Sequence, residues 1–401
     1  MNGKHEEPVP VVVVGITPMH YDVFPFVLPG TSAAGNDSAT TTPVDNPALS
    51  AGPPPAAHPQ PLQQHEMDTC TNISVDCPRC QETFLLSEIW HPDMTKAAFM
   101  KEVLASDATV NHYTGFSSLP MLRATFDWLK PSAEYIRLWN GKGTAQGADA
   151  KVRRRRNQSL FDEFLLTLIR LRRGYDNEML SSMFAMSASQ ASKIFLSWVC
   201  YLDQVLAPLI QYPSKEMVAD NLPDCFEAFP NTRVILDCFE IQIQKPKRPA
   251  AQRQTWSNYK HNNTIKVLVG IMPSGAITFV SDSYAGSISD VEIVKESGLL
   301  RLIERGDDVM ADRGFTIRHL LLALGATLNI PAFTHGNPLN PKALLKSRRI
   351  ASVRIHVERA IGRVKKFAIL DGPMHISLRY VVSKIVRICC VMCNLQGRLA
   401  E

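Results

Sequence analysis

The spacing of apolar positions predicts a helical segment in the middle of the chain. Residues 159–174 carry apolar side chains at every third or fourth position, which indicates a helix that ends at Gly174. Two more helices, 177–184 and 188–206, flank a turn of three residues. Such a tight turn is typical of helix-turn-helix DNA-binding units, although an ordinary helical hairpin gives the same pattern. The second helix would present its exposed first residues to DNA, namely Ser189, Gln190, Ser192 and Lys193.

The pattern changes to short apolar runs after Pro230, which predicts a β-sheet. The expected strands are 233–237, 241–244, 265–271, 276–280 and 308–312. Residues 286–290 precede a predicted helix, and Asp290 is interpreted as its N-cap. A later helix, 350–367, has an apolar stripe with a period of 3.6 residues.

Three carboxylates fall at notable positions in this pattern. Asp237 and Asp312 each end a predicted strand, and Glu358 lies at the edge of the apolar stripe on the late helix. Carboxylates that converge from neighbouring strands and a helix can hold two divalent cations, and hard oxygen ligands select Mg²⁺ or Mn²⁺. Alternatively, the two aspartates cap turns and Glu358 pairs with Arg354 or Arg359.

The first part of the chain shows neither the helical nor the strand periodicity of apolar residues. Residues 1–85 are rich in Pro, Ala, Thr, Ser and Gln, which predicts a disordered leader. Cys77 and Cys80 have the spacing of a zinc half-site, but no second pair follows, and four ligands are needed. Residues 86–150 are expected to form a lead-in of short helices, 151–210 a basic run with the helix-turn-helix, and 228–397 the sheet-containing domain.

Charge separates the leader from the rest of the chain. Residues 1–90 carry a net charge of −8. Because the whole chain carries +5, the remaining residues carry a net charge of +13. A basic body suits a polyanion such as DNA, but a soluble surface explains it equally well. Directly before the first helix lies a basic run that can grip phosphates or direct nuclear import, or can form a solvated linker: Arg153, Arg154, Arg155 and Arg156, with Lys151.

Several protein classes are excluded by the sequence. No uncharged apolar stretch is long enough to span a membrane, and the first residues do not have the pattern of a signal peptide. The nine cysteines show no paired framework, which indicates reduced thiols. We therefore expect an intracellular protein.

The sequence motifs around the three carboxylates resemble those of a known family. The strings VILDCFEIQIQKP, TWSNYKHNNTIKVLVGI, GSISDVEI, VMADRGF and IASVRIHVERAIGRVKKF are similar to the DDE superfamily endonuclease domain of PIF/Harbinger-type transposases and their domesticated relatives. The resemblance extends over residues 113–396 and includes the helix-turn-helix. It implies an α/β fold: an RNase H-like mixed sheet with flanking helices, preceded by the all-α helix-turn-helix module and the leader.

The resemblance also implies the site. Its catalytic, metal-binding triad falls on Asp237, Asp312 and Glu358, with Mg²⁺ as the cofactor and Mn²⁺ as a substitute. Asp290 in GSISD is an additional candidate metal ligand. One departure is Phe239, which stands where relatives place a small Thr or Ser, and this puts the fine geometry near Asp237 in question.

The expected activity is DNA cleavage, with double-stranded DNA as the partner. An intact triad favours an active enzyme over a domesticated, catalytically silent DNA-binding protein, because mutually repelling carboxylates are costly without metal. A ribonuclease with the same fold is a further alternative. We also expect a homo-oligomer, a separate DNA-binding partner protein, and residence in the nucleus with the cytoplasm as a second compartment. Trp256, Tyr259, Lys260 and His261 lie on an expected hairpin loop that touches DNA or simply packs.

Overall fold

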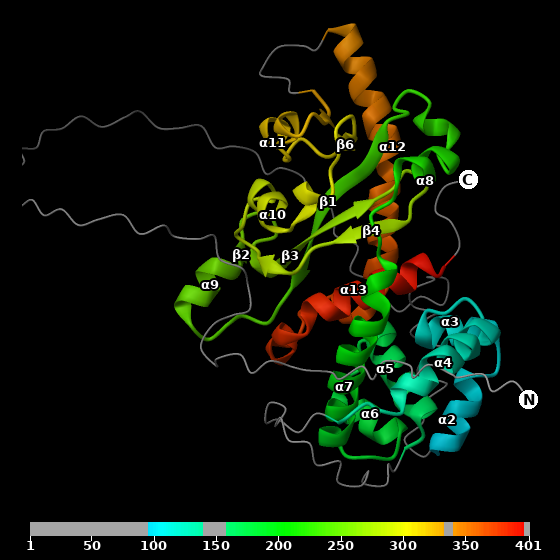
Figure 1. Cartoon of the computed structure of the whole chain (residues 1–401). Coiled ribbons are helices and arrows are strands. Elements are labelled where there is room, and N and C mark those ends of the chain that lie inside the picture. Colours follow the sequence, from blue (N-terminus) through cyan, green and yellow to red (C-terminus); the bar gives the residue numbers. More distant parts are fainter. Residues whose placement is uncertain (1–94, 139–157, 333–339, 397–401) are drawn as a thin grey trace, which may run out of the picture. The chain divides into compact units, whose positions relative to one another are not determined.

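The structure is a computed structural model that describes residues 95–138, 158–332 and 340–396 (Figure 1). The predicted leader, Cys77 and Cys80, and the basic run with Arg153 to Arg156 lie outside the described residues. The predictions for these segments are therefore not tested.

The N-terminal described part is entirely helical. It contains α2 (Lys96–Val103), α3 (Asp107–Thr114), α4 (Leu119–Ala133), α5 (Leu160–Arg173), α6 (Asn177–Met183) and α7 (Ala188–Leu206). Trp198 of α7 donates a hydrogen bond from Nε1 to Oε2 of the buried Glu163 of α5, at 2.9 Å. A charged group buried in this way needs such a partner, so the bond fixes α7 against α5.

The helix-turn-helix boundaries agree with the sequence prediction to within one residue. The hydroxyl of Ser159 caps α5, and Gly174 ends it with a φ of 69°, in the left-handed region that glycine adopts easily. Asp176 caps α6 and Ser187 caps α7. Local capping chemistry thus sets the starts of these three helices and the end of α5.

The sheet is mixed and has the strand order β2-β3-β1-β6-β7. The strands are β1 (Thr232–Gln242), β2 (Trp256–Ser257), β3 (Asn262–Ile271), β4 (Ile277–Val280), β5 (Tyr284–Ala285), β6 (Asp308–Met310) and β7 (Thr327–Asn329). β3 pairs antiparallel with β1, β4 and β5, whereas β6 runs parallel to both β1 and β7. This mixed sheet with flanking helices confirms the predicted fold class.

The prediction of two short strands, 233–237 and 241–244, was wrong. One strand, β1, covers the first and runs into the start of the second, and Asp237 lies in its middle, opposite Val269 of β3. The polar residues between the two apolar runs do not interrupt the strand, because Glu240 finds partners on β3: its Oε2 accepts a hydrogen bond from Thr264, and Lys266 lies 3.8 Å from its Oε1.

Helices surround the sheet: α8 (Lys215–Asp220), α9 (Pro249–Thr255), α10 (Asp290–Glu296), α11 (Arg318–Ala323), α12 (Pro341–Lys365) and α13 (Val382–Asn394). Short 3₁₀ helices connect them: η1 (Ala207–Leu209), η2 (Asp224–Phe226), η3 (Leu299–Arg301), η4 (Ala368–Leu370) and η5 (Ile376–Tyr380). The late helix, α12, begins nine residues before the predicted start at 350. Asn340 caps it and Pro341 occupies its first turn, both of which favour an earlier start.

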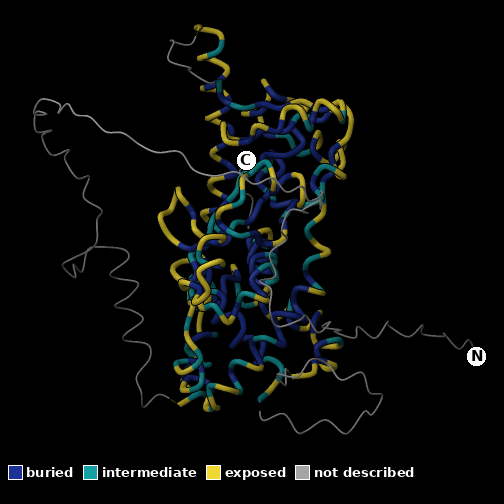
Figure 2. The backbone as a smooth tube through the Cα atoms, turned by 90° about the vertical axis from the view of Figure 1, so that its left-hand side faces the viewer, coloured by how far each residue is buried: buried dark blue, intermediate teal, exposed yellow. Residues whose placement is uncertain are grey.

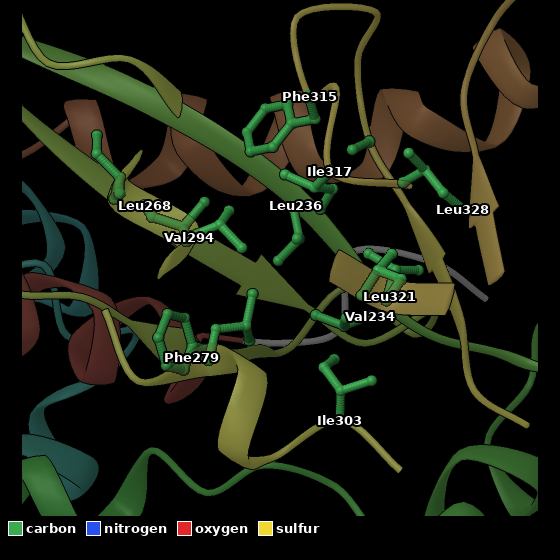
Figure 3. Packing of buried hydrophobic residues seen from close by; sticks show 14 of the residues in the cluster. Val234, Leu236, Leu268, Phe279, Val294, Ile303, Phe315, Ile317, Leu321 and Leu328 are labelled. Carbon is green, nitrogen blue, oxygen red and sulfur yellow. The ribbon is translucent and has the colours of Figure 1, made fainter. Parts of the chain in front are cut away.

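A hydrophobic core fills the space between the sheet and helices α10 and α11. Leu236 and Val234 of β1 pack there with Val294 of α10, Leu321 of α11 and Phe315 (Figure 3). Figure 2 shows buried positions along much of the described backbone, with exposed positions at turns and along the outer sides of helices. Because side chains alternate along a strand, Asp237 faces away from this core, on the side where α12 contacts β1.

Ion pairs join α7 of the helical part to α13 of the sheet part. The buried Asp203 accepts a hydrogen bond from Nε of Arg387 at 2.7 Å and one from Nζ of Lys384 at 3.1 Å. Arg387 also pairs with Asp282 at 2.9 Å. These contacts fasten α7 to the sheet part at a buried, fully paired acid.

Candidate active site

Asp237 and Asp312 lie at the same level of two adjacent strands. In the parallel pairing of β1 with β6, Ile235 is opposite Met310, and each aspartate follows its strand residue by two positions. Asp312 stands just beyond β6, in the turn that precedes Phe315, and its side chain is 56% exposed. Strand register therefore places the two predicted ligands at the same level, with Asp312 exposed beyond the end of β6.

Asp237 is held in a half-buried setting. Its Oδ1 accepts a hydrogen bond at 2.8 Å from the backbone N–H of Cys238. Burial raises its pKa to about 6; Arg354 and the Cys238 N–H act against this, and Asp312 and Asp290 add to it. A carboxylate whose charge is disfavoured by burial and by two neighbouring acids gains from a nearby cation.

Arg354 of α12 is the cation that the structure places among these acids. Its Nη1 donates to Asp312 Oδ1 at 3.1 Å, and its Nη2 lies 4.0 Å from Oε1 of Glu358, one helical turn away. The residue is buried, and its Nε has no hydrogen-bond partner among the described residues. The alternative pairing of Glu358 with Arg354, considered from the sequence, is therefore present.

Glu358 points to solvent from the edge of the apolar stripe of α12, and its side chain is 58% exposed. Across the described residues, no cluster of three or more His, Cys, Asp or Glu side chains is close enough to hold a metal ion. The structure thus aligns Asp237 with Asp312 and links both to Arg354, whereas the convergence of Glu358 with them stays a prediction.

The interpretation of Asp290 as a helix N-cap was wrong. Ser289 is the N-cap of α10 and forms a capping box with Glu292, so Asp290 is the first residue inside the helix. Nζ of Lys266 lies 3.3 Å from Asp290 Oδ1 and donates to Ile288 O at 3.0 Å. Asp290 thus belongs to the acid cluster that raises the pKa of Asp237.

Sequence reasoning missed one basic residue of this region, Lys266, and considered Arg354 only as a partner of Glu358. Both carried a signal: each is a charged residue within an otherwise apolar buried pattern, Lys266 in the middle of β3 and Arg354 four residues before Glu358. A buried charge is rarely retained without a partner, so such a position points to an acid nearby.

The residue that departs from the family motif, Phe239, is buried on the same face of β1 as Asp237. The helix-turn-helix positions are accessible: Ser189 and Lys193 are exposed, and Gln190 and Ser192 are half-buried, all within the first two turns of α7. Their contact with DNA stays a prediction.

The structure also bears on the membrane question. Among the residues that it describes, none of the helices combines the length and the apolar character needed to cross a membrane.

Comparisons with known proteins match both parts of the chain. A family model described as "DDE superfamily endonuclease" matches residues 236–394, and one described as "Helix-turn-helix of DDE superfamily endonuclease" matches residues 159–208. The chain is similar to "Protein ALP1-like" of Arabidopsis thaliana, with 21% identity over 305 residues, which cover 71% of this chain and 72% of the relative.

Two rodent proteins named "Putative nuclease HARBI1" are also similar. The protein of Rattus norvegicus is 25% identical and that of Mus musculus 26% identical, each over 197 residues. These matches cover 46% of this chain and 52% of each relative, so the matched region spans about half the length of the rodent proteins. The endonuclease model includes Asp237, Asp312 and Glu358.

Proposed function

This chain belongs to the Harbinger-derived endonucleases of the DDE superfamily, and from this premise we propose that it is a metal-dependent nuclease that cuts phosphodiester bonds of DNA. The proposed catalytic and metal-binding residues are Asp237, Asp312 and Glu358. The observation that carries the proposal is the register of β1 with β6, which places Asp237 and Asp312 at the same level of the two adjacent strands.

The donor set fits a hard divalent cation, for which we propose Mg²⁺, with Mn²⁺ as a substitute. Asp237 supports this assignment because its buried carboxylate, with a pKa raised to about 6, is poorly compensated by protein groups alone. When bound, such cations supply the Lewis acid that activates a water and stabilises the leaving oxygen. Asp290 lies close enough to influence Asp237 and is a further candidate ligand.

The chain's own residues would prepare this site. The Cys238 N–H fixes one oxygen of Asp237, and Arg354 holds Asp312 by a hydrogen bond at 3.1 Å. For Glu358 to join the two aspartates, its side chain would rotate from solvent toward β1, away from the 4.0 Å contact with Arg354. Arg354 would keep its hydrogen bond to Asp312.

DNA would be bound through the helix-turn-helix, by Ser189, Gln190, Ser192 and Lys193 at the start of α7. The basic run, Arg153 to Arg156, would add phosphate contacts. We propose nuclear residence because the substrate is DNA. A homo-oligomer and a separate DNA-binding partner protein remain part of the proposal.

A second candidate function is a catalytically silent DNA-binding protein. One observation favours it: Arg354 already compensates Asp312 and Glu358, so the acids can persist in a folded protein without metal. This weakens the argument that three acidic residues would not survive the loss of catalysis.

Nicking of supercoiled plasmid by the purified full chain in Mg²⁺ or Mn²⁺ separates the two functions. The Asp312→Asn variant keeps the shape and removes one ligand charge, and Asp220→Asn, an exposed acid at the end of α8, is the matched control. If the protein is a nuclease, the parent and Asp220→Asn both nick the plasmid. Asp312→Asn then nicks it at least about a hundredfold more slowly. If all three proteins bind DNA but none nicks it, the silent DNA-binding function is correct.

A further inference from the structure

A polar groove opens near the C-terminal end of β1, away from the candidate active site. It has a volume of about 460 Å³, and its lining includes Gln242 at the end of β1, Lys245 after it, Arg253 of α9, Trp256 of β2, Asn262 of β3 and Pro373. Backbone hydrogen bonds between Gln242, Gln244 and Met374 build one wall. We call this feature the β1–β2 groove.

The segment that supplies most of the groove's lining is basic. Residues 241–281 contain six Lys or Arg residues and no Asp or Glu. Lys245, Lys247 and Arg253 are exposed, and none of the three forms a salt bridge within the described part of the chain. Since exposed acids normally accompany exposed bases, this arrangement favours a polyanionic ligand, whose phosphates would supply the missing partners.

Aromatic rings are exposed beside these cations. The side chain of Trp256 lines the groove and is 44% exposed, and Tyr259, three residues on, is 80% exposed. The Lys260 ammonium lies 4.8 Å from the centre of the Tyr259 ring. The loop is held in shape by a hydrogen bond from Lys260 N to Ser257 Oγ at 3.1 Å, and His261 has a φ of 52°. The turn therefore presents the rings to solvent. This is contrary to the alternative in which the hairpin loop simply packs against the protein.

Exposed aromatic rings with unpaired cations are the combination that binds single-stranded nucleic acid, since bases stack on the rings while the cations contact phosphates. In a duplex the base faces are covered by neighbouring bases, so stacking on Trp256 requires an unpaired nucleotide. The groove's amide groups, such as Asn262, can add contacts to base edges.

We propose that the β1–β2 groove binds unpaired nucleotides of DNA, with Trp256 as the stacking platform and Lys245 and Arg253 as phosphate contacts. The inference rests on the proposed function for the identity of the nucleic acid. Ile243 follows Asp237 by six positions along the same chain, which corresponds to about 20 Å at ~3.3 Å per residue. The groove would therefore hold a strand segment a few nucleotides away from the bond that is cut.

The test is fluorescence anisotropy of the full chain with a labelled single-stranded DNA oligonucleotide and with the duplex of the same sequence, in EDTA so that no cleavage occurs. Trp256→Ala is compared with Trp256→Phe, which keeps a stacking ring, and with Trp128→Ala, which removes a tryptophan that is 58% exposed on α4. We expect Trp256→Ala to weaken single-strand binding about tenfold, while Trp256→Phe and Trp128→Ala stay within about twofold of the parent.

The phosphate contacts have their own readout. Replacing both Lys245 and Arg253 with alanine should reduce the slope of log affinity against log salt by about 1.4 on single strands, because each lost contact removes ~0.7. The proposal is overturned if Trp256→Ala binds single strands as tightly as the parent does. It is also overturned if Trp256→Ala loses as much affinity for the duplex as for the single strand. The anisotropy measurement follows binding and not cleavage, so it can be interpreted even if the protein is an inactive nuclease. Conversely, absence of single-strand binding in the groove would leave the nicking test unaffected.

Discussion

At the scale of single residues, the tightest backbone approach explains why glycine opens the GSISD motif. A Cβ atom on Gly286 would lie 2.1 Å from the Thr264 hydroxyl and 2.8 Å from the carbonyl oxygen of Thr255. Making room would require a shift of β3, which carries Thr264, or of the end of α9, which carries the Thr255 carbonyl. The glycine therefore allows the chain before α10 to lie directly against β3, which sets the position of Asp290.

Replacing Gly286 with alanine should lower the free energy of unfolding by about 1–3 kcal/mol, the usual cost of inserting a methylene group into a filled space. Gly362→Ala on α12 is the matched control, because a Cβ there meets no atom within 4 Å. In the helix this control should be neutral or slightly stabilising. Urea denaturation followed by circular dichroism measures both, and equal stability of Gly286→Ala and the parent would refute the packing argument.

Arg354 acts on the ionisation of Asp237 at the same scale. Its charge lowers the pKa of a carboxyl that burial has raised to about 6, so removing the charge should raise that pKa further. The Arg354→Gln variant tests this with ¹³C-aspartate NMR, in which Asp237→Asn identifies the resonance. A pKa that stays the same or falls in Arg354→Gln would show that the guanidinium does not compensate Asp237.

At the scale of elements, local signals predicted the helices better than the sheet. The ends of α5, α6 and α7 follow from caps adjacent in sequence, such as Ser159 and Gly174, and these were predicted to within one residue. The continuity of β1 was missed because Glu240 is tolerated inside the strand only through Thr264 and Lys266 on β3. Partners that lie far apart in sequence leave no local pattern to read.

The candidate site likewise has features that local sequence revealed and features that depend on long-range packing. The motifs identified Asp237, Asp312 and Glu358, and the apolar period placed Glu358 at the edge of a helix. The register of β1 with β6 and the central position of Arg354 depend on how strands and α12 pack, which the sequence does not reveal.

The exposed start of α7 leads to a prediction about DNA affinity. Lys193→Ala should weaken binding to duplex DNA about threefold to tenfold and reduce the slope of log affinity against log salt by about 0.9. Lys130→Ala on α4, also an exposed lysine in a helix, is the control. Anisotropy titrations at several salt concentrations provide both numbers, and an equal effect of the two substitutions would argue against α7 as the DNA-facing helix.

At the scale of the whole described chain, a buried acid fastens α7 to α13. Burial alone would raise the pKa of Asp203, but hydrogen bonds and charge from Arg387, with the charge of Lys384, lower it below its ordinary value. Asp203→Asn should cost about 3 kcal/mol of unfolding free energy, since it removes the charge of a buried acid and leaves two half-buried cations partly unpaired. Arg387 keeps Asp282, so the loss is expected at the lower end of the usual range.

The same contact predicts a pH dependence. A carboxyl whose pKa is lowered by folding stabilises the folded state above its unfolded pKa, about 3.9, and loses that contribution as the pH falls through the folded value. The stability gap between the parent and Asp203→Asn should therefore be full at pH 7 and should shrink below about pH 4. Denaturation curves across this range measure the gap, and a constant gap would contradict the role of Asp203 ionisation.

The central claim is that Asp237 and Asp312, joined by Glu358, form a divalent metal site. The most direct measurement is a titration of Mn²⁺ into the full chain, with free Mn²⁺ followed by electron paramagnetic resonance. The account predicts saturable binding by the parent and by Asp220→Asn, and a loss of at least about tenfold in affinity for Asp312→Asn. Equal Mn²⁺ binding by the parent and Asp312→Asn, or none by the parent, would contradict it.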